Sequence, residues 1–289
     1  MVELIRALGV FCEPPKDEHI KLAEILGFSE SPCSDIYQEI FCDNLPPYAS
    51  IYTSNEGIVG GEALGRISGF WQALQRDVPH EPDHLSRLLG LAAFLQESQA
   101  SEQEPARAVL IERSLAALFW EHLLPWLPMY LDRIESFGKG TVYDDWAKLL
   151  SETLICKFET LGPLENLPRH LDASSRLLDP RRSGATQFLS SLLAPVQSGF
   201  ILLREDLNNI SAEIGIPTED RERQGILKDL LREEPKQTLE GLAKVAYERS
   251  YYTSERWGLL GSLCLHWERR AKESGELLHQ LSCDLKEED

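Results

Sequence analysis

The chain contains 289 residues, of which 43% are hydrophobic and 26% are charged, and this composition provides enough apolar material for a large core. Lys and Arg number 29 against 47 Asp and Glu, so the formal net charge is −18, which disfavours nucleic-acid binding and would attract a basic peptide. No apolar run approaches the roughly 20 residues of a membrane span, and the first residues lack the basic region of an export signal. We therefore expect a cytoplasmic protein with no membrane insertion.

Helical periodicity dominates the N-terminal half of the chain, and strand-like alternation is scarce. A first helix is expected at the N-terminus, and the connector "DNLPPYASIYTSNEGIVGGE" separates the next two helices from those that follow. In the segment 105–134, Pro125 and Pro128 are expected to kink or divide the helix. The helices expected after the first one cover 18–28, 34–43, 62–76, 83–97, 105–134 and 142–160.

The C-terminal half begins with a change of composition around 162–184, where prolines and "DPRRSG" indicate an irregular connector. Further helices are expected near 185–194, 203–214, 223–233, 237–250 and 255–281. No repeat of fixed period is present. We predict an all-α protein, a helical bundle with a core over 1–165, a connector over 166–184, and a C-terminal helical segment over 185–289 that packs on or extends the core.

The sequence "HEPDH" matches the zinc-hydrolase pattern H-E-x-x-H at His80, Glu81 and His84. That chemistry requires one continuous helix, because both histidines must point at one metal. Pro82 drives the preceding residue towards extended geometry, and Pro79 also resists a regular helix. We therefore expect no metal site, and a zinc-dependent hydrolase is kept only as an alternative.

A helix that begins at Pro82 or Asp83 fits this segment better. Proline suits a first helical position, and an aspartate at the cap or in the first turn complements the free N–H groups. Asp83 and His84 would then form a partly exposed pair. One helical face would carry Leu85, Leu88, Leu89, Ala92 and Leu95.

The connector over 45–61 is unusually aromatic for a spacer. Tyr48 and Tyr52 flank Ser50 and could line a groove, because tyrosine offers apolar area together with a hydroxyl. The alternative is that both rings only pin the loop to the core. The glycines that follow do not form a nucleotide-binding pattern.

The segment "LFWEHLLPWLPMYL" places four aromatic residues around Glu121 and His122. It is either a core helix with a buried histidine or the wall of a groove whose accessible aromatic area marks a partner site. The aromatic residues are Phe119, Trp120, Trp126 and Tyr130.

No motif places a catalytic nucleophile, so we predict a protein without catalytic residues. Six cysteines occur without any C-x-x-C pair and are expected to be reduced, mostly packing thiols. Residues 202–231 have the cadence of a helix-turn-helix, but their acidic side chains favour a plain helical hairpin. A helical scaffold or regulatory interaction protein acting through this region is a further alternative.

Three segments, in this order, resemble the TorD-like redox-enzyme maturation chaperones: "LPPYASIYTSNEGIVGGEALGRISGFWQAL", "EPDHLSRLLGLAAFL" and "FWEHLLPWLPMYLDRI". The resemblance covers about residues 1–165. It implies an all-helical cytoplasmic chaperone that binds the twin-arginine signal peptide of a molybdoenzyme catalytic subunit. Such a chaperone delays export until the molybdenum cofactor is inserted. It would be a monomer or homodimer with no stably bound cofactor, although transient contact with a molybdenum cofactor or nucleotide is compatible with the family.

The resemblance also implies client-binding residues. The tyrosine loop of the family falls on Tyr48, Ser50 and Tyr52, and its Asp-His turn falls on Glu81, Pro82, Asp83 and His84, without the residue that usually separates the proline from the aspartate. Its aromatic helix falls on Phe119, Trp120, His122, Leu123 and Trp126. We add Trp71 as a groove residue, and we expect Asp83 or Glu81 to accept hydrogen bonds from a client arginine. The chain is longer than many members of the family.

Overall fold

The computed structural model describes residues 2–162, 166–217 and 222–285. Within these ranges the chain forms helices and loops without any strand, and one isolated antiparallel bridge joins Tyr48 to His84. The predicted all-α class is therefore confirmed. The chain divides into an N-terminal unit, Met1–Thr53 with Ile58–Pro168, and a C-terminal unit, Ser54–Gly57 with Arg169–Asp289.

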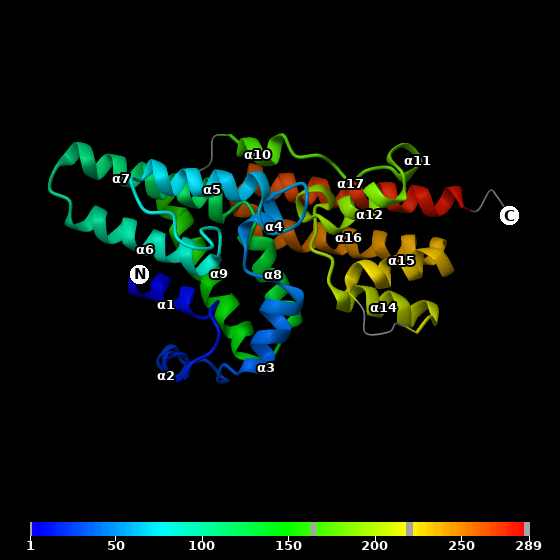
Figure 1. Cartoon of the computed structure of the whole chain (residues 1–289), viewed down its shortest axis with the longest axis horizontal. Coiled ribbons are helices and arrows are strands. Elements are labelled where there is room, and N and C mark those ends of the chain that lie inside the picture. Colours follow the sequence, from blue (N-terminus) through cyan, green and yellow to red (C-terminus); the bar gives the residue numbers. More distant parts are fainter. Residues whose placement is uncertain (1, 163–165, 218–221, 286–289) are drawn as a thin grey trace. The chain divides into compact units, whose positions relative to one another are not determined.

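Figure 1 shows the helices of the N-terminal unit. Their core contains several large aromatic side chains. Trp146 of α9 is fully buried and its indole N–H donates to the carbonyl of Leu8 in α1 at 2.8 Å. The Phe41 ring meets both Tyr143 and Trp146 edge-on. The elements of this unit are α1 (Val2–Val10), α2 (Asp17–Leu26), α3 (Ser34–Tyr37), η1 (Gln38–Asn44), α4 (Ala49–Thr53), α5 (Gly61–Ala73), α6 (Leu85–Ser101), α7 (Pro105–Ala117), η2 (Leu118–Leu123), α8 (Leu127–Phe137) and α9 (Val142–Leu161).

Local sequence explains where several of these helices end. Gly27 closes α2 with a left-handed φ of 75°, and its N–H bonds back to Ala23 and Glu24. Thr141 caps α9 by accepting from the N–H of Tyr143. The predicted division of 105–134 is confirmed: the chain leaves helical geometry around Pro125, and Pro128 stands in the first turn of α8, where proline is tolerated.

Two expectations about local structure are wrong. Helix α6 begins at Leu85, not at Pro82 or Asp83, because His84 is extended and its ring nitrogen accepts from the N–H of Ser86 as the N-cap. The expected helix over 34–43 is only four residues of α-helix before a wider π-helical segment, η1. The predicted apolar face of α6 is correct, since its five residues are all buried.

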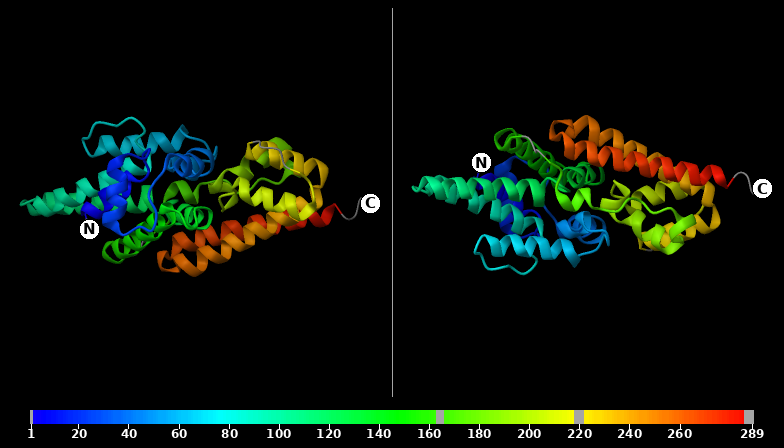
Figure 2. Two further views of the ribbon diagram at one scale, coloured as in Figure 1. Left: turned by 90° about the horizontal axis from the view of Figure 1, so that it is seen from below. Right: turned by 90° about the horizontal axis from the view of Figure 1, so that it is seen from above.

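The C-terminal unit is built on a long antiparallel hairpin of α16 and α17, joined by the short η3 (Figure 2). The shorter helices and the segment between them cover this hairpin. Gly199 approaches it closely: a Cβ at this position would lie 2.3 Å from the backbone nitrogen of Ala271. The elements are α10 (Arg169–Asp172), α11 (Pro180–Ser183), α12 (Ala185–Leu193), α13 (Pro195–Ser198), α14 (Arg204–Ile214), α15 (Arg223–Glu233), α16 (Pro235–Trp257), η3 (Gly258–Leu260) and α17 (Ser262–Asp284).

A buried arginine fixes the irregular connector to this hairpin. The side chain of Arg270 is 7% exposed, and its guanidinium donates to the backbone carbonyls of Ser174, Ser175 and Val196. The buried guanidinium thereby finds acceptors in backbone carbonyls of the connector and of α13.

All six cysteines are free. Cys12 and Cys264 are buried, as expected of packing thiols. Cys33, Cys42 and Cys156 are exposed, so for these three residues the expectation of core packing is wrong. Over the ranges that the structure describes, no helix has the length and apolar character required to cross a membrane.

Candidate functional site

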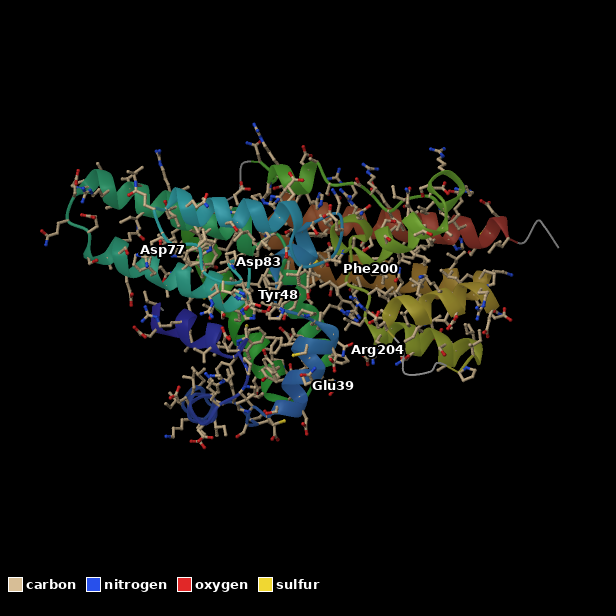
Figure 3. The ribbon with its side chains drawn as sticks, in the orientation of Figure 1. Glu39, Tyr48, Asp77, Asp83, Phe200 and Arg204 are labelled. Carbon is tan, nitrogen blue, oxygen red and sulfur yellow. The ribbon has the colours of Figure 1, made fainter. Side chains whose placement is uncertain are left out.

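The loop before α4 and the turn before α6 are joined into one junction (Figure 3). The N–H of Leu85 donates to the carbonyl of Pro47 at 2.8 Å, and the N–H of Ala49 donates to the carbonyl of Asp83 at 3.0 Å. The Tyr48–His84 bridge lies between these two bonds. Backbone pairing therefore brings together two motifs that lie more than 30 residues apart in the sequence, both of which were predicted as client-binding segments.

Asp83 is the buried centre of this junction. Its side chain is 1% exposed, so the predicted partly exposed Asp-His pair is wrong. Oδ2 accepts from the N–H of Ser50 at 3.2 Å and from its hydroxyl at 2.5 Å, whereas Oδ1 has no hydrogen-bond partner among the described residues. The Ser50 hydroxyl also accepts from the N–H of Gly60 at 3.1 Å. Asp83 therefore holds the start of α4 and does not cap α6.

Glu81 is the carboxylate of the turn that faces solvent. Its side chain is 44% exposed, and Oε1 accepts from the Tyr48 hydroxyl at 2.7 Å. That hydrogen bond lowers the pKa of Glu81, while burial and the neighbouring carboxylate raise the pKa of Tyr48. The backbone of Glu81 has a φ of 57°, a value that is uncommon outside glycine. The turn thus holds a charged carboxylate outward at a conformational cost.

His84 is 6% exposed and packs edge-on against the Tyr48 ring, with ring centroids 4.9 Å apart. Its Nδ1 accepts from the N–H of Ser86 and lies 2.8 Å from the Ser86 hydroxyl, which donates to Glu13 at 2.6 Å. Burial lowers the pKa of His84, so the ring is neutral near pH 7 with its proton on Nε2. This histidine positions the turn and ties it to the segment after α1.

The zinc hypothesis does not hold. His80 and His84 do not share a helix, because the residues between them form a turn. The His80 side chain is 96% exposed, and Nδ1 of His84 is engaged by Ser86. In the described part of the chain, no group of three His, Cys, Asp or Glu side chains could hold a metal ion.

The predicted groove aromatics lie inside the unit. Tyr52 stacks on Trp126 with ring centroids 5.1 Å apart, and its hydroxyl donates to the carbonyl of Pro46. The Trp71 indole donates to the carbonyl of Pro82 at 3.2 Å. Phe119, Trp120, Leu123 and Trp126 are also buried. Of the two alternatives left open for these aromatic residues, the structure shows packing in the core, and of the two predicted tyrosines only Tyr48 is partly exposed.

His122 is buried beside a half-buried cation that the sequence did not indicate. Burial and the nearby Arg66 guanidinium lower the pKa of His122 to about 4. Its Nδ1 has no hydrogen-bond partner among the described residues, and its ring lies 4.6 Å from that of Phe70. Arg66 reaches the Thr53 hydroxyl at 3.4 Å. Arg66 and Glu13 were missed because neither stands in a recognisable motif.

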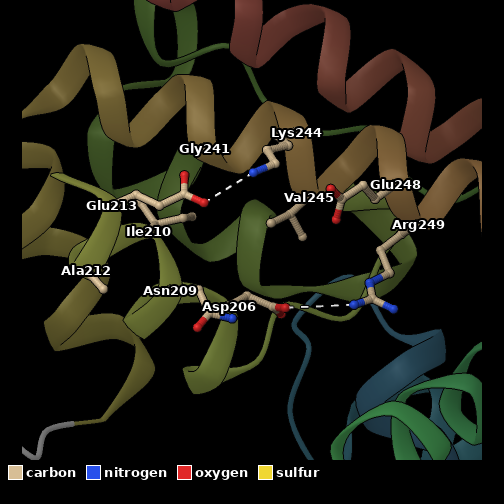
Figure 4. A pocket seen from close by; sticks show the side chains of 10 residues that line it. All are labelled: Asp206, Asn209, Ile210, Ala212, Glu213, Gly241, Lys244, Val245, Glu248 and Arg249. Atoms are coloured by element: carbon tan, nitrogen blue, oxygen red, sulfur yellow. Dashed lines mark hydrogen bonds and ion pairs between the residues drawn. The ribbon is translucent and has the colours of Figure 1, made fainter.

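A cavity of about 420 Å³ opens between α14 and α16 of the C-terminal unit (Figure 4). Ion pairs cross it, with Lys244 lying 3.2 Å from Glu213 and Arg249 lying 3.9 Å from Asp206. Gly241 allows Ile210 to approach α16 closely. Because these charged side chains pair with each other, the ion pairs hold α14 and α16 together and are not free to bind a ligand. Its α14 side lies in the segment 202–231, which was considered only for the alternative of a scaffold or regulatory protein.

Comparison with known proteins finds a similarity to a described family over the segment that contains the junction. Residues 29–132 match the family described as Nitrate reductase delta subunit. Over this segment, the chain is similar to that family. All of the predicted client-binding residues, from Tyr48 to Trp126, lie within the matched range. The family resemblance stated from the sequence is therefore confirmed.

The similar curated proteins are chaperones. "Chaperone protein TorD" from Vibrio cholerae serotype O1, strain Classical Ogawa 395, is 26% identical over 119 residues, which are 40% of this chain and 54% of that protein. The protein of the same name from strain M66-2 is 25% identical over the same shares. The chain thus spans about half the length of the curated relatives it matches.

Proposed function

We propose that this protein is a cytoplasmic, non-enzymatic chaperone that matures a molybdopterin-dependent oxidoreductase subunit. It binds the twin-arginine signal peptide of that subunit and delays export until the molybdenum cofactor is inserted. The observation that carries the proposal is the family match over 29–132, which contains the complete junction of Tyr48, Ser50, Glu81, Asp83 and His84. The names of the TorD relatives support the chaperone activity.

Within this proposal, Glu81 receives a client arginine. Of the two candidate carboxylates, Asp83 is buried and holds Ser50, while Glu81 is exposed and keeps a lowered pKa. Tyr48 occupies one lone pair of the Glu81 carboxylate and leaves acceptor capacity for a guanidinium. The strongly acidic chain adds a long-range attraction for a basic signal peptide.

The proposed chaperone holds no cofactor stably. The molybdenum cofactor is the cargo of the client, and contact with it, or with a nucleotide, is transient. The partners are the catalytic subunit and its signal, without nucleic acid, and the protein acts as a monomer or homodimer. The buried aromatic residues stabilise the junction. Tyr52 and Trp71 donate hydrogen bonds to the carbonyls of Pro46 and Pro82, and Trp126 stacks on Tyr52.

Calorimetric titration with a synthetic twin-arginine peptide tests the proposal, together with identification of molybdoenzyme subunits that co-purify from the native cytoplasm. Glu81→Gln keeps the bond from Tyr48 but removes the charge, and it should weaken peptide binding about tenfold, as expected for one charge-assisted contact. The matched control is Glu24→Gln. Glu24 is an exposed residue of α2, and its replacement should leave the affinity unchanged. Absence of both peptide heat and a co-purifying subunit would refute the proposed function.

A further inference from the structure

Ile58 and Val59 form an exposed apolar pair in the loop that precedes α5. Their exposed fractions are 62% and 52%. Burial of such side chains is worth about 1.5–3 kcal/mol each, so leaving two adjacent ones in water forgoes a stabilising contact. Both residues lie in the first of the segments that resemble the chaperone family, between the tyrosine loop and α5. The N-terminal unit therefore leaves this apolar area free to contact a partner.

This apolar pair is held in place by the candidate site. The N–H of Gly60, the next residue, donates to the Ser50 hydroxyl at 3.1 Å, and that hydroxyl donates to the buried Asp83 at 2.5 Å. Gly60 has a φ of 113°, which a residue with a side chain would adopt only under strain. Helix α5 then begins at Gly61. Because its C-terminal side is fixed, the pair is presented as a pre-formed surface, which lowers the entropic cost of binding.

A single bound peptide is long enough to contact both the apolar pair and Glu81. Gly60 and Asp83 are joined through Ser50, Ile58 precedes Gly60 by two residues, and Glu81 precedes Asp83 by two. Two extended residues span about 7 Å, so the backbones of Ile58 and Glu81 are at most roughly 25 Å apart, which about seven extended residues can bridge. A peptide with a cation at one end and apolar residues at the other matches this arrangement.

We propose that Ile58 and Val59 bind the apolar segment that follows the arginine pair of the client signal, while Glu81 binds an arginine of the same peptide. This inference rests on the proposed function, because it assigns a second contact to the same ligand. The occupant is a single peptide whose charge and apolar segment complement the exposed carboxylate and the apolar pair. Specificity for such a signal then requires both contacts at a fixed spacing.

The test measures two peptides on three forms of the full chain. One peptide carries an arginine pair followed by leucines and alanines, and the other has serines in place of the apolar residues. The proteins are the wild type, the double variant Ile58→Ser/Val59→Ser and the control Val109→Ser/Leu110→Ser. The control removes an adjacent pair of similar exposure, 46% and 61%, from α7 in the same unit. Circular dichroism and thermal unfolding confirm that each variant is folded.

The wild type and the control should bind the apolar peptide about tenfold more tightly than the serine peptide, whereas Ile58→Ser/Val59→Ser should bind both with equal affinity. The inference is overturned if that variant still discriminates tenfold, or if the α7 control loses as much. These outcomes leave the proposed function standing, because peptide binding itself persists. If the wild type binds neither peptide, the inference fails together with signal-peptide binding. Glu81→Gln should weaken both peptides equally, since it acts on the arginine contact.

Discussion

In each unit a buried charged side chain holds an irregular segment against the helices. The two charges have opposite signs. In the N-terminal unit the charge is the carboxylate of Asp83, which binds the start of α4 and leaves one oxygen without a hydrogen bond among the described residues. In the C-terminal unit it is the guanidinium of Arg270, which donates to three backbone carbonyls. Arg270 serves the fold alone, whereas the Asp83 junction also presents an exposed carboxylate and an apolar pair to solvent. The difference separates the junction that we propose to bind a client from a contact that holds a connector in place.

Each unit also contains a buried histidine whose pKa is strongly lowered, His122 in the N-terminal unit and His266 in the C-terminal unit, and low pH should destabilise both units through these residues. Burial, then nearby arginine charge, lowers the pKa of His122 and of His266 to about 4. Unfolding restores the ordinary value near 6.5, so the unfolded chain binds more protons between these pH values. Stability is therefore complete above about pH 6.5 and falls as the pH is lowered towards 4, by about 3 kcal/mol for each histidine.

Urea unfolding at several pH values measures this loss. Replacing either histidine by glutamine should flatten the stability curve between pH 6.5 and 4, and the effect should lie in the unit that carries the change. His80→Gln is the control, because this side chain is 96% exposed and should leave the curve as it is. A wild-type curve with no slope attributable to His122 or His266 would contradict the assignment.

Loss of the buried cation should be the next largest effect. Arg270→Leu leaves the carbonyls of Ser174, Ser175 and Val196 without their donor, so we expect about 2–3 kcal/mol of destabilisation of the C-terminal unit. Amide hydrogen exchange should report faster opening of α17 and of the connector. Arg269→Leu changes an exposed neighbour on the same helix and should cost far less. Equal effects of the two variants would show that the carbonyl contacts contribute nothing.

Sequence reasoning located most helices to within a few residues, because periodic apolar positions report which helical face is buried. The same reasoning misplaced the start of α6, where Pro82 and Asp83 fit general rules for a first turn but His84 provides the actual cap. It also misjudged the exposure of Asp83. The partner that buries this carboxylate, Ser50, is 33 residues away, and no local pattern reports a contact of that range.

The surface that we propose to bind the client was predicted only in part, for a related reason. The aromatic residues that form the strongest sequence signal, such as Trp126 and Tyr52, stack on each other in the core. A run of aromatic residues is equally compatible with a groove wall and with a packed interior, and only tertiary contacts decide between them. No sequence pattern indicated that Ile58 and Val59 are exposed, because apolar residues in a loop are common in any sequence.

Replacing Asp83 sharpens the comparison between the two units. Asp83→Ala removes the oxygen that accepts both hydrogen bonds from Ser50 and should cost about 2 kcal/mol, while Asp83→Asn keeps an acceptor oxygen and should cost about half as much. Both variants leave the exposed Glu81 carboxylate in place. If Asp83 acts by positioning, Asp83→Asn should therefore retain most of its affinity for an arginine peptide, whereas Glu81→Gln loses affinity without losing stability. Urea unfolding and peptide titration on the same samples separate these roles. Loss of peptide affinity in Asp83→Asn with unchanged stability would instead make Asp83 a direct ligand of the client.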